Sequence, residues 1–240
     1  MSIIDLFKDE YKFKARLLPA IVSSIPAVIL IWILTHCFCQ SHKLFVFWGP
    51  LFSSLLFSAY ALKWFGVMLV CWTGRTIESV LFKDGLKFPS TEILLWCNDC
   101  LSQQHKKSIR NKIANELGIK LLSQKQEEND IDEARKTIRD AIDRVRKIVG
   151  DGRTVLQYNI HYGAIRNLIG GCCWACLLSL SVAVIGYFKN DGCYIFCLGI
   201  TLVVIYAFPL ILMSPLLKSF GKRYAKTLLA EYMTTEYYNK

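Results

Sequence analysis

Four long apolar stretches constrain the fold of this chain more than any other feature of its sequence. They run over 17–39, 44–72, 167–188 and 193–217, and Lys63 is the only formal charge inside them. A helix of about 20 residues crosses a hydrocarbon core roughly 30 Å thick. Because lipid offers no hydrogen-bond partners to the backbone, each stretch is predicted to be helical. The sequence therefore predicts an all-α, polytopic membrane protein with four transmembrane helices.

The overall composition favours membrane spans over the buried helices of a soluble core. The chain has 240 residues, of which 53% are hydrophobic, whereas soluble domains usually stay near about 45–50% even with Gly included. The first stretch is also longer than the apolar segment of a signal peptide, which takes about 7–15 residues. We therefore expect 17–39 to be a permanent span.

The distribution of Lys and Arg predicts the orientation of the chain, because these residues accumulate on the cytoplasmic side. They cluster before the first stretch, within 73–166 and after 217, while the two short connections carry only Lys43 and Lys189. The region 73–166 holds 17 Lys and Arg against 13 Asp and Glu. We expect a multi-pass protein of the cell inner membrane with a cytoplasmic N-terminus and C-terminus.

Five segments follow from this pattern. They are a cytoplasmic N-terminal segment (1–16), a first transmembrane hairpin (17–72), a cytoplasmic helical region between the second and third spans (73–166), a second transmembrane hairpin (167–217) and a cytoplasmic C-terminal tail (218–240).

Two amphipathic helices are predicted inside 73–166. One follows Asp130, which begins a capping box, and it ends at Gly150. The other runs over about 102–117 and ends at Gly118. Each has one apolar stripe at helical spacing and a charged opposite face, so each is expected to pack on a partner.

The rest of this region has weaker signals. A short helix is expected from about Thr91, and the polar segment 121–129 is expected to be an exposed turn. Apolar and polar residues alternate over 156–162 as in a strand, but no partner strand is visible in the sequence. We therefore interpret 156–162 as a helix leading into the third span.

Small residues mark two surfaces for close helix packing. One is formed by Gly170, Gly171, Cys172 and Ala175, and the other lies within 53–59. Packing inside one chain and packing between subunits of a homo-oligomer both remain open. Lys63 lies about 28 Å along the helix from residue 44, so its ammonium is expected to reach the inner interface. The apolar extension 64–72 would then have to be covered by protein.

No sequence pattern points to catalysis. The sequence contains no Gly-rich dinucleotide loop, phosphate loop or HExxH metal motif, and no nucleophile elbow. The carboxylates near Asp130 are explained by helix capping and the helix dipole. Cys97 and Cys100 form a lone CxxC, a weak zinc signal that we interpret as two thiols one helical turn apart. We therefore expect no enzyme activity, no cofactor and no metal.

The formal net charge of +10 raises nucleic acid as a partner. Charges in 73–166 alternate in sign, which suits a solvated helix better than a phosphate track. Basic residues beside anionic lipid account for the rest. Direct nucleic-acid binding is therefore disfavoured.

Two motifs flank the membrane. Gly74-Arg75-Thr76-Ile77-Glu78 follows the second stretch, and Tyr162-Gly163-Ala164-Ile165-Arg166-Asn167 leads into the third. Arg75 and Glu78 are three residues apart and can pair on a helix. Anchoring of the membrane edge by Arg75 and Arg166 is the plainer interpretation.

Together with Pro89-Ser90-Thr91, these motifs resemble a family of uncharacterised bacterial multi-span inner-membrane proteins that often accompany anti-phage defence systems. The resemblance covers about residues 60–175. It implies a set of partner- or ligand-binding residues: Arg75, Glu78, Arg139, Asn159, Tyr162, Gly163, Arg166 and Asn167. The chain departs from the family pattern at Ala164-Ile165, which replaces an aromatic–basic pair, and at His161. These departures would alter a site that binds an anion.

Two hypotheses of function follow. The first is an oligomeric membrane effector or sensor of anti-phage defence, which disrupts or gates the membrane on a cytoplasmic signal. The second is a non-conducting membrane scaffold that recruits a cytoplasmic partner protein through 73–166. Both place the chain in a lipid bilayer, and the first also predicts a homo-oligomer and a protein partner of the same system.

Overall fold

The computed structural model describes residues 10–39, 48–150, 152–189 and 193–235, without the side chains of 35–63 and 153. The chain is 85% helical, and the described residues contain no strand, which confirms the predicted all-α class. The chain divides into two compact units. Unit 1 comprises Met1–Ile77 and Gly163–Ser214, and unit 2 comprises Glu78–Tyr162 and Pro215–Lys240.

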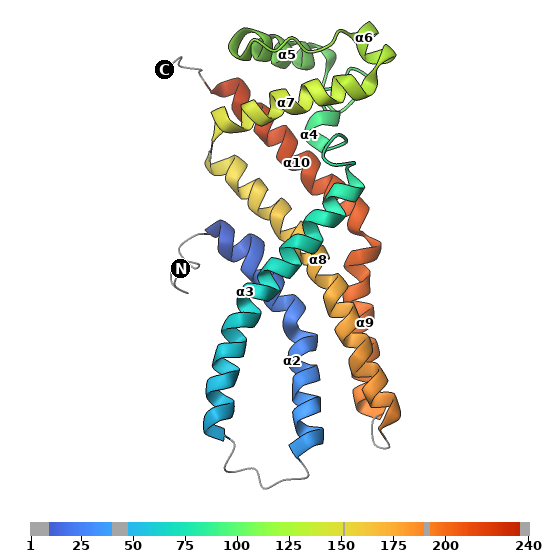
Figure 1. Ribbon diagram of the computed structural model, residues 1–240. Coiled ribbons are helices and arrows are strands. Elements are labelled where there is room, and N and C mark those ends of the chain that lie inside the picture. The colour runs from blue at the N-terminus through green and yellow to red at the C-terminus, as the bar shows by residue number, and fades with distance from the viewer. Residues whose placement is uncertain (1–9, 40–47, 151, 190–192, 236–240) are drawn as a thin grey trace. The chain divides into compact units, whose positions relative to one another are not determined.

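The helices are labelled in Figure 1. In chain order they are the π-helix η1 (Lys12–Leu17), α2 (Leu18–Cys39), α3 (Trp48–Leu81), α4 (Pro89–Glu92), α5 (Gln103–Leu117), α6 (Gln124–Asn129), α7 (Ile131–Val149), α8 (Arg153–Phe188), α9 (Cys193–Ile211) and α10 (Met213–Thr234).

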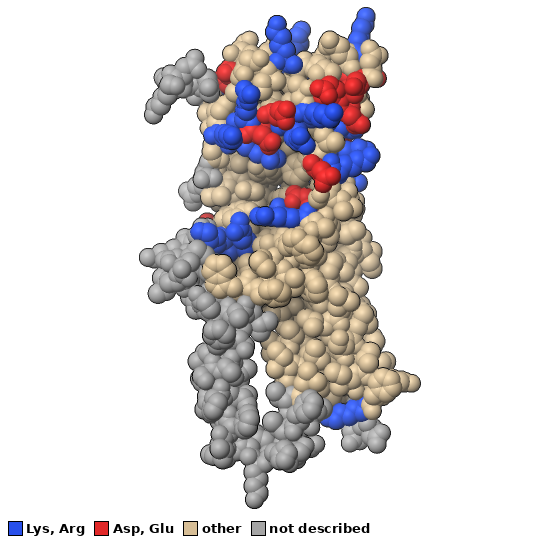
Figure 2. All heavy atoms as spheres, viewed as in Figure 1, with Lys and Arg blue, Asp and Glu red and all other residues tan. Residues whose placement is uncertain are grey.

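Among the described residues, three helical segments are long and apolar enough to cross a membrane. They are Lys12–Leu34, Thr154–Phe188 and Cys193–Ile211. Large apolar side chains are exposed on them, including Val28, Val184 and Val204 at 63%, 53% and 64%. Figure 2 shows a broad face without charged residues over α9 and the later part of α8. Apolar surface of this extent is stable in hydrocarbon and costly in water.

The predicted second span, 44–72, falls mostly on residues that the structure does not describe in full. Residues 44–47 and the side chains of 48–63, including Lys63 and the 53–59 surface, lie outside the described set. This span therefore stays a prediction. In the extension 64–72, Val70 is 5% exposed, whereas Trp64, Met68 and Trp72 are 57–62% exposed, so the described residues cover one side of the apolar extension and leave the other exposed.

Glycines bring α8 against α3 at backbone distance. A Cβ on Gly170 would lie 2.5 Å from the carbonyl oxygen of Val70, and a Cβ on Gly74 would lie 2.7 Å from that of Arg166. No side chain fits there. The small-residue surface near Gly170 therefore serves packing inside the chain, which decides between the two interpretations left open for it.

The hairpin of α8 and α9 uses the same principle. A Cβ on Gly199 would meet the backbone nitrogen of Ala183 at 2.5 Å, and one on Gly186 would meet the Cα of Phe196 at 2.8 Å. Close approach of this kind replaces the hydrophobic drive that is absent between helices in lipid. Sequence inspection had singled out the Gly170 surface but not this second one.

Prolines in α2 free backbone carbonyls that other helices then satisfy. Pro26 has no N–H to donate to the Val22 carbonyl four residues earlier. The hydroxyl of Tyr206 on α9 donates to that oxygen over 2.7 Å. Because a free carbonyl is costly in lipid, this bond fixes α2 against α9.

Unit 2 has its own hydrophobic core. Its buried apolar residues come from the turn after α4 and from α5, α7, the start of α8 and α10: Ile93, Leu94, Leu95, Ile109, Ile113, Ala134, Ile138, Ala141, Ile142, Val145, Val155, Tyr224, Ala225, Leu228, Leu229 and Tyr232. The α7 members recur at three- and four-residue spacing, so they form the one buried stripe that the sequence predicted.

The predicted ends of the two amphipathic helices are confirmed. Asp130 Oδ1 accepts a hydrogen bond from the Glu133 amide at 3.0 Å, and α7 stops before Gly150, whose φ is 61°. Ser102 caps α5 by accepting from the His105 amide, and Gly118 ends that helix with φ of 68°. These are the usual chemistries of N-terminal and C-terminal caps.

Two segments bear on the weaker predictions. The segment 121–129 is not simply an exposed turn, because it contains α6, capped by Ser123 and anchored by Glu127, which is 3% exposed. The segment 156–162 lies inside α8, so its interpretation as a helix is confirmed.

The C-terminal residues differ most from expectation. The predicted last span, 193–217, divides into α9 and α10, and α10 packs into the unit 2 core instead of forming a tail. Lys112 Nζ donates to the carbonyls of Tyr232 and Thr235 at 2.8 and 2.6 Å, which caps the end of α10. The basic residues after 217 favoured a cytoplasmic tail in the sequence, although apolar residues recur at helical spacing in the same segment.

Candidate functional site

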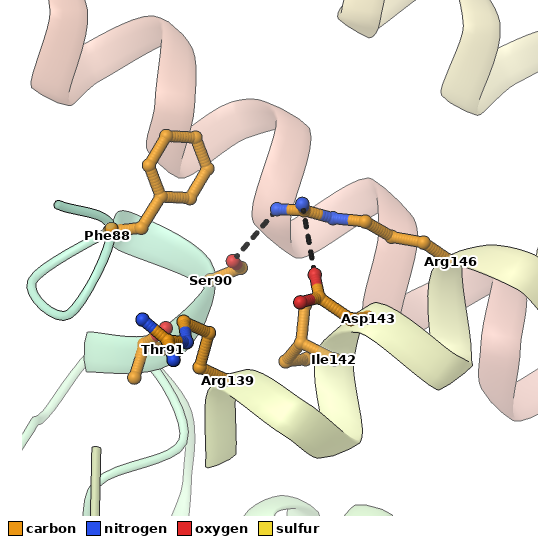
Figure 3. A pocket seen from close by; sticks show the side chains of 8 residues that line it. Phe88, Ser90, Thr91, Arg139, Ile142, Asp143 and Arg146 are labelled. Carbon is orange, nitrogen blue, oxygen red and sulfur yellow. Dashed lines mark hydrogen bonds and ion pairs between the residues drawn. The ribbon is translucent and has the colours of Figure 1, made fainter. Parts of the chain in front are cut away.

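A shallow cleft of about 210 Å³ lies in unit 2 between α7 and the segment that enters α4. Figure 3 shows the side chains that line it, from Gly85, Phe88, Ser90, Thr91, Arg139, Ile142, Asp143 and Arg146. The four residues from α7 are three, four and seven positions apart, so they share one face of that helix.

A tight turn after α3 forms the other wall. Lys83, Asp84 and Gly85 have φ of 47°, 53° and 85°, a left-handed conformation that Gly adopts without strain. The Lys87 amide donates to the Phe82 carbonyl at 2.9 Å and closes the turn. The residues 82–87 therefore form a closed loop between α3 and α4.

Three residues shortly after the turn line the cleft: Phe88, Ser90 and Thr91. Phe88 is extended, and Pro89 begins α4 with the φ that this position requires. Ser90 and Thr91 follow and are each 1% exposed. Two buried hydroxyl groups therefore lie opposite the arginines of α7 (Figure 3).

Arg146 extends across the cleft, and the hydrogen bonds that its N–H groups donate there are long. Its Nη2 lies 3.4 Å from Ser90 Oγ and its Nη1 lies 3.4 Å from Asp143 Oδ1. Both distances exceed the 2.7–2.9 Å that is usual for charged N–H···O bonds. Its Nε is buried and meets no acceptor among the described residues. The guanidinium also lies 5.5 Å from the centroid of the Phe88 ring.

Arg139 is the predicted site residue that the structure places in the cleft. Its Nε lies 3.9 Å from Asp140 Oδ1, beyond hydrogen-bond distance, and its side chain is 42% exposed. Figure 3 shows it beside Thr91. Sequence reasoning missed Arg146, although its position seven residues later on the same helix face was a usable signal.

Two other arginines of unit 2 are bonded very differently. Arg110 Nη2 donates to Leu94 O at 2.7 Å and to Glu127 Oε2 at 2.9 Å, and both side chains are nearly inaccessible. Burial lowers the pKa of Arg110, and the bond and charge of Glu127 oppose that shift. This pair closes α5 against α6, and Arg110 donates four hydrogen bonds to groups of the fold.

Arg135 is also committed to the fold. Its Nε donates to Glu92 Oε1 at 2.7 Å and its Nη1 to Asp132 Oδ1 at 3.0 Å. The hydrogen bond that Arg135 donates to Glu92 is the main cause that raises the pKa of Arg135. We call Arg110 and Arg135 the framework arginines, because they hold the fold of unit 2 together. Their hydrogen bonds are shorter than the polar contacts of the two arginines in the cleft.

Lys106 is another buried cation of the framework. Its side chain is fully buried, and its ammonium donates to the carbonyls of Leu95, Trp96 and Asn98. It fills the turn after α4 and fixes the position of that turn. No sequence pattern marks Lys106 as buried, because its neighbours on α5 are polar.

Tyr162 and Glu78, two predicted site residues, are brought together in unit 2. The Tyr162 hydroxyl donates to Glu78 Oε1 at 2.5 Å, and Tyr162 is 4% exposed. The Phe88 ring meets Tyr162 edge to face at 5.6 Å. Contacts therefore lead from Arg146 in the cleft through Phe88 to the Tyr162–Glu78 pair.

Asn167 and Arg166 lie in unit 1 and contact each other there. Asn167 is fully buried, and its Nδ2 donates to the Ala15 carbonyl at 2.6 Å. Pro19 has no N–H to donate to that carbonyl, so Asn167 supplies the missing donor. Arg166 Nε is 3.4 Å from Asn167 Oδ1. The structure thus gives Asn167 a role in joining η1 to α8.

The remaining predicted residues are dispersed. Arg75 is exposed on α3, and Asn159 is half-buried on α8 outside the residues that line the cleft. Gly163 is buried in unit 1, where an added Cβ would lie 3.3 Å from the Cβ of Ala15.

The described residues contain no group of three His, Cys, Asp or Glu side chains placed to hold a metal ion. The CxxC thiols are free, with Cys97 exposed and Cys100 packed against the unit 2 core. The side chains that line the cleft include Arg139 and Arg146, which offer hydrogen-bond donors and positive charge.

The three long apolar helices indicate a helical membrane protein, and unit 2 gives it a separate charged module with its own core. Comparison with protein-family models, with curated proteins and with solved structures finds no match to this chain. The motif resemblance described above and the defence role that it implies therefore stay predictions.

Proposed function

We propose that this chain is a four-span inner-membrane protein with a cytoplasmic sensing module formed by unit 2. Two kinds of observation support the topology: the three apolar segments found among the described residues, and the apolar sequence of 44–72 as a fourth. The clusters of Lys and Arg before the first span, within 73–166 and after the last support a cytoplasmic location for both termini and unit 2.

We propose further that unit 2 receives a cytoplasmic signal and passes it to the spans, which gate or disrupt the membrane. One observation carries this: the boundaries between the units fall inside continuous helices, at Ile77/Glu78 within α3 and at Tyr162/Gly163 within α8. A packed helix transmits displacement because cores are close to incompressible. The motifs around Arg75 and Arg166 support a setting in anti-phage defence, with homo-oligomers forming any conducting path.

The alternative function is a non-conducting scaffold that recruits a cytoplasmic partner protein. The observation in its favour is the surface of unit 2, on which positive and negative side chains alternate (Figure 2). Such a surface suits electrostatic docking of a protein. A scaffold needs no change in the spans, and that difference separates the two functions.

The test is membrane potential in bacteria that produce the chain, followed with a potential-sensitive dye. The proposed effector depolarises the cells, either on overproduction or on phage challenge. A matched strain carries Gly74→Leu, which blocks the contact of α3 with α8, and a control strain carries Gly66→Leu, where an added Cβ meets nothing within 4 Å.

We expect the Gly74→Leu strain to stay polarised and the Gly66→Leu strain to behave as wild type. Cells that remain polarised at full expression through phage challenge contradict the effector function. If those cells also yield a cytoplasmic partner that Arg144→Glu releases, the scaffold function takes its place.

A further inference from the structure

The cleft between α4 and α7 has the features of a binding site, and the fold of unit 2 does not need these features. The framework arginines, Arg110 and Arg135, make hydrogen bonds of 2.6–3.2 Å to carboxylates or carbonyls. Among the described residues, Arg139 and Arg146 make none shorter than 3.4 Å. Their guanidinium groups therefore hold donor capacity in reserve, and a guanidinium has five N–H donors to use.

The chemistry of the lining selects the class of ligand. Two guanidinium groups seven residues apart on α7 face the buried hydroxyls of Ser90 and Thr91, with a single carboxylate, Asp143, on the same wall. Guanidinium groups and hydroxyls bind the oxygens of a phosphate group well, because the fork of N–H donors matches them in pairs.

The size of the cleft limits the ligand. About 210 Å³ is less than the roughly 300–1,000 Å³ of pockets that enclose drug-sized molecules. A phosphate or pyrophosphate group fits this space, with any larger attached group left outside. From these observations we propose that the Arg139–Arg146 cleft binds a small phosphate-bearing anion.

Binding there has a direct route to the helices that leave unit 2. The Arg146 guanidinium lies 5.5 Å from the Phe88 ring centroid and 5.8 Å from that of Tyr224, within cation–π range. Phe88 in turn packs on Tyr162, which bonds Glu78. An anion that draws Arg146 toward itself weakens its hold on Phe88 and frees the ring to repack. This regulatory consequence rests on the proposed function, whereas binding itself does not.

The experiment titrates inorganic pyrophosphate into the full chain in neutral detergent, by calorimetry at constant ionic strength set with chloride. Constant ionic strength matters because screening changes any charged interaction. We expect saturable binding that Arg139→Gln weakens about tenfold or more, the loss expected for one charge-assisted hydrogen bond. Arg144→Gln on the same helix removes the same charge outside the cleft and is expected to bind as wild type.

Arg146→Gln is the second variant, and Arg146→Lys keeps its charge without the paired donors, so it too is expected to lose affinity. Because Arg146 packs on two rings and its loss can unfold the unit, Arg139→Gln decides the result. Absence of saturable binding, or equal weakening by Arg139→Gln and Arg144→Gln, overturns the site.

The phosphate group can belong to a soluble molecule or to a lipid headgroup. Repeating the titration in nanodiscs separates these sources, with phosphatidic acid in one set and phosphatidylcholine alone in the other. An apparent affinity for pyrophosphate that falls in phosphatidic acid assigns the cleft to a headgroup, and an unchanged affinity assigns it to a soluble anion. Binding without any depolarisation in cells leaves the site standing and removes the proposed effector function.

Discussion

Tyr206 donates a hydrogen bond to the backbone carbonyl of Val22 over 2.7 Å, across two helices of unit 1. That carbonyl is the one that Pro26 deprives of its α-helical donor, since proline has no N–H. A proline inside an apolar helix thus acquires a partner on another helix, as the shortage of hydrogen bonds in lipid requires.

Asn167 repeats this arrangement two turns earlier, where η1 joins α2. It donates to the Ala15 carbonyl over 2.6 Å, and that carbonyl lies four residues before Pro19. The carbonyl four residues before Pro19 and the carbonyl four residues before Pro26 therefore each accept a hydrogen bond from a side chain of α8 or α9. These two bonds set the positions of three helices without any charged group.

The first prediction concerns the Tyr206 bond. Tyr206→Phe is expected to lower the free energy of unfolding by about 0.5–2 kcal/mol, the range of hydrogen bonds between helices in membranes. In a Pro26→Ala background the residue 26 amide can donate to Val22, so the same substitution is expected to cost less. Denaturant unfolding of the four proteins in micelles measures the coupling. Equal costs in both backgrounds would show that Tyr206 does not serve the proline-freed carbonyl.

The second prediction concerns the glycine contact of α3 and α8. Gly170→Ala places a Cβ 2.5 Å from the Val70 carbonyl, so the helices must separate. We expect a loss of about 1–3 kcal/mol, as for other overpacked sites. Gly66→Ala on α3 meets nothing within 4 Å and is expected to be neutral or slightly stabilising, because Ala favours helices. Thermal unfolding in detergent compares them, and equal melting temperatures would contradict the contact.

The third prediction concerns the buried Arg110–Glu127 pair. Glu127→Ala leaves the Arg110 guanidinium buried without its counter-charge, which costs about 3–5 kcal/mol for comparable pairs. Its neighbour Glu128 is exposed on the same short helix, so Glu128→Ala is expected to change stability by no more than about 0.5 kcal/mol. Urea unfolding of the full chain, followed by tryptophan fluorescence, measures the difference. Similar midpoints for both variants would count against the pair.

The fourth prediction concerns the Tyr162–Glu78 bond. Tyr162→Phe keeps the ring against Phe88 but removes the hydroxyl that donates to Glu78 over 2.5 Å. Loss of a hydrogen bond to a charged group is expected to cost about 1.5–3 kcal/mol. Tyr158→Phe, one turn earlier on α8, is the matched control and is expected to be neutral. Amide hydrogen exchange at 78–82 is expected to rise only in Tyr162→Phe, and unchanged exchange would exclude a joint between α3 and α8 there.

Much of the fold was predictable because it depends on patterns that are local in sequence. The apolar stretch at 17–39, the α9 part of the predicted stretch 193–217, the stripe of α7 and the caps at Asp130 and Gly118 all rest on contacts within a few residues. The strand-like alternation at 156–162 did not lead to a predicted strand, because a strand without a partner is unstable.

The rest depends on pairings between distant segments, which one sequence does not reveal. Lys106 and Glu127 look like surface charges until the turn after α4 surrounds them. The apolar residues of α10 have no visible purpose until the unit 2 core receives them. For the candidate site, motif resemblance pointed to Arg139, but Arg146, Ser90 and Phe88 required the turn at 83–85 that brings them together.

The proposed function depends most on the membrane topology, and one measurement tests that topology directly. An epitope tag is inserted at Lys120, an exposed residue between α5 and α6, and a second protein carries the tag at Ser41, between the first two predicted spans. Antibody is applied to intact spheroplasts and then to permeabilised ones. The account predicts that the Ser41 tag is labelled in intact spheroplasts and the Lys120 tag only after permeabilisation. Labelling of the Lys120 tag in intact spheroplasts would contradict the account.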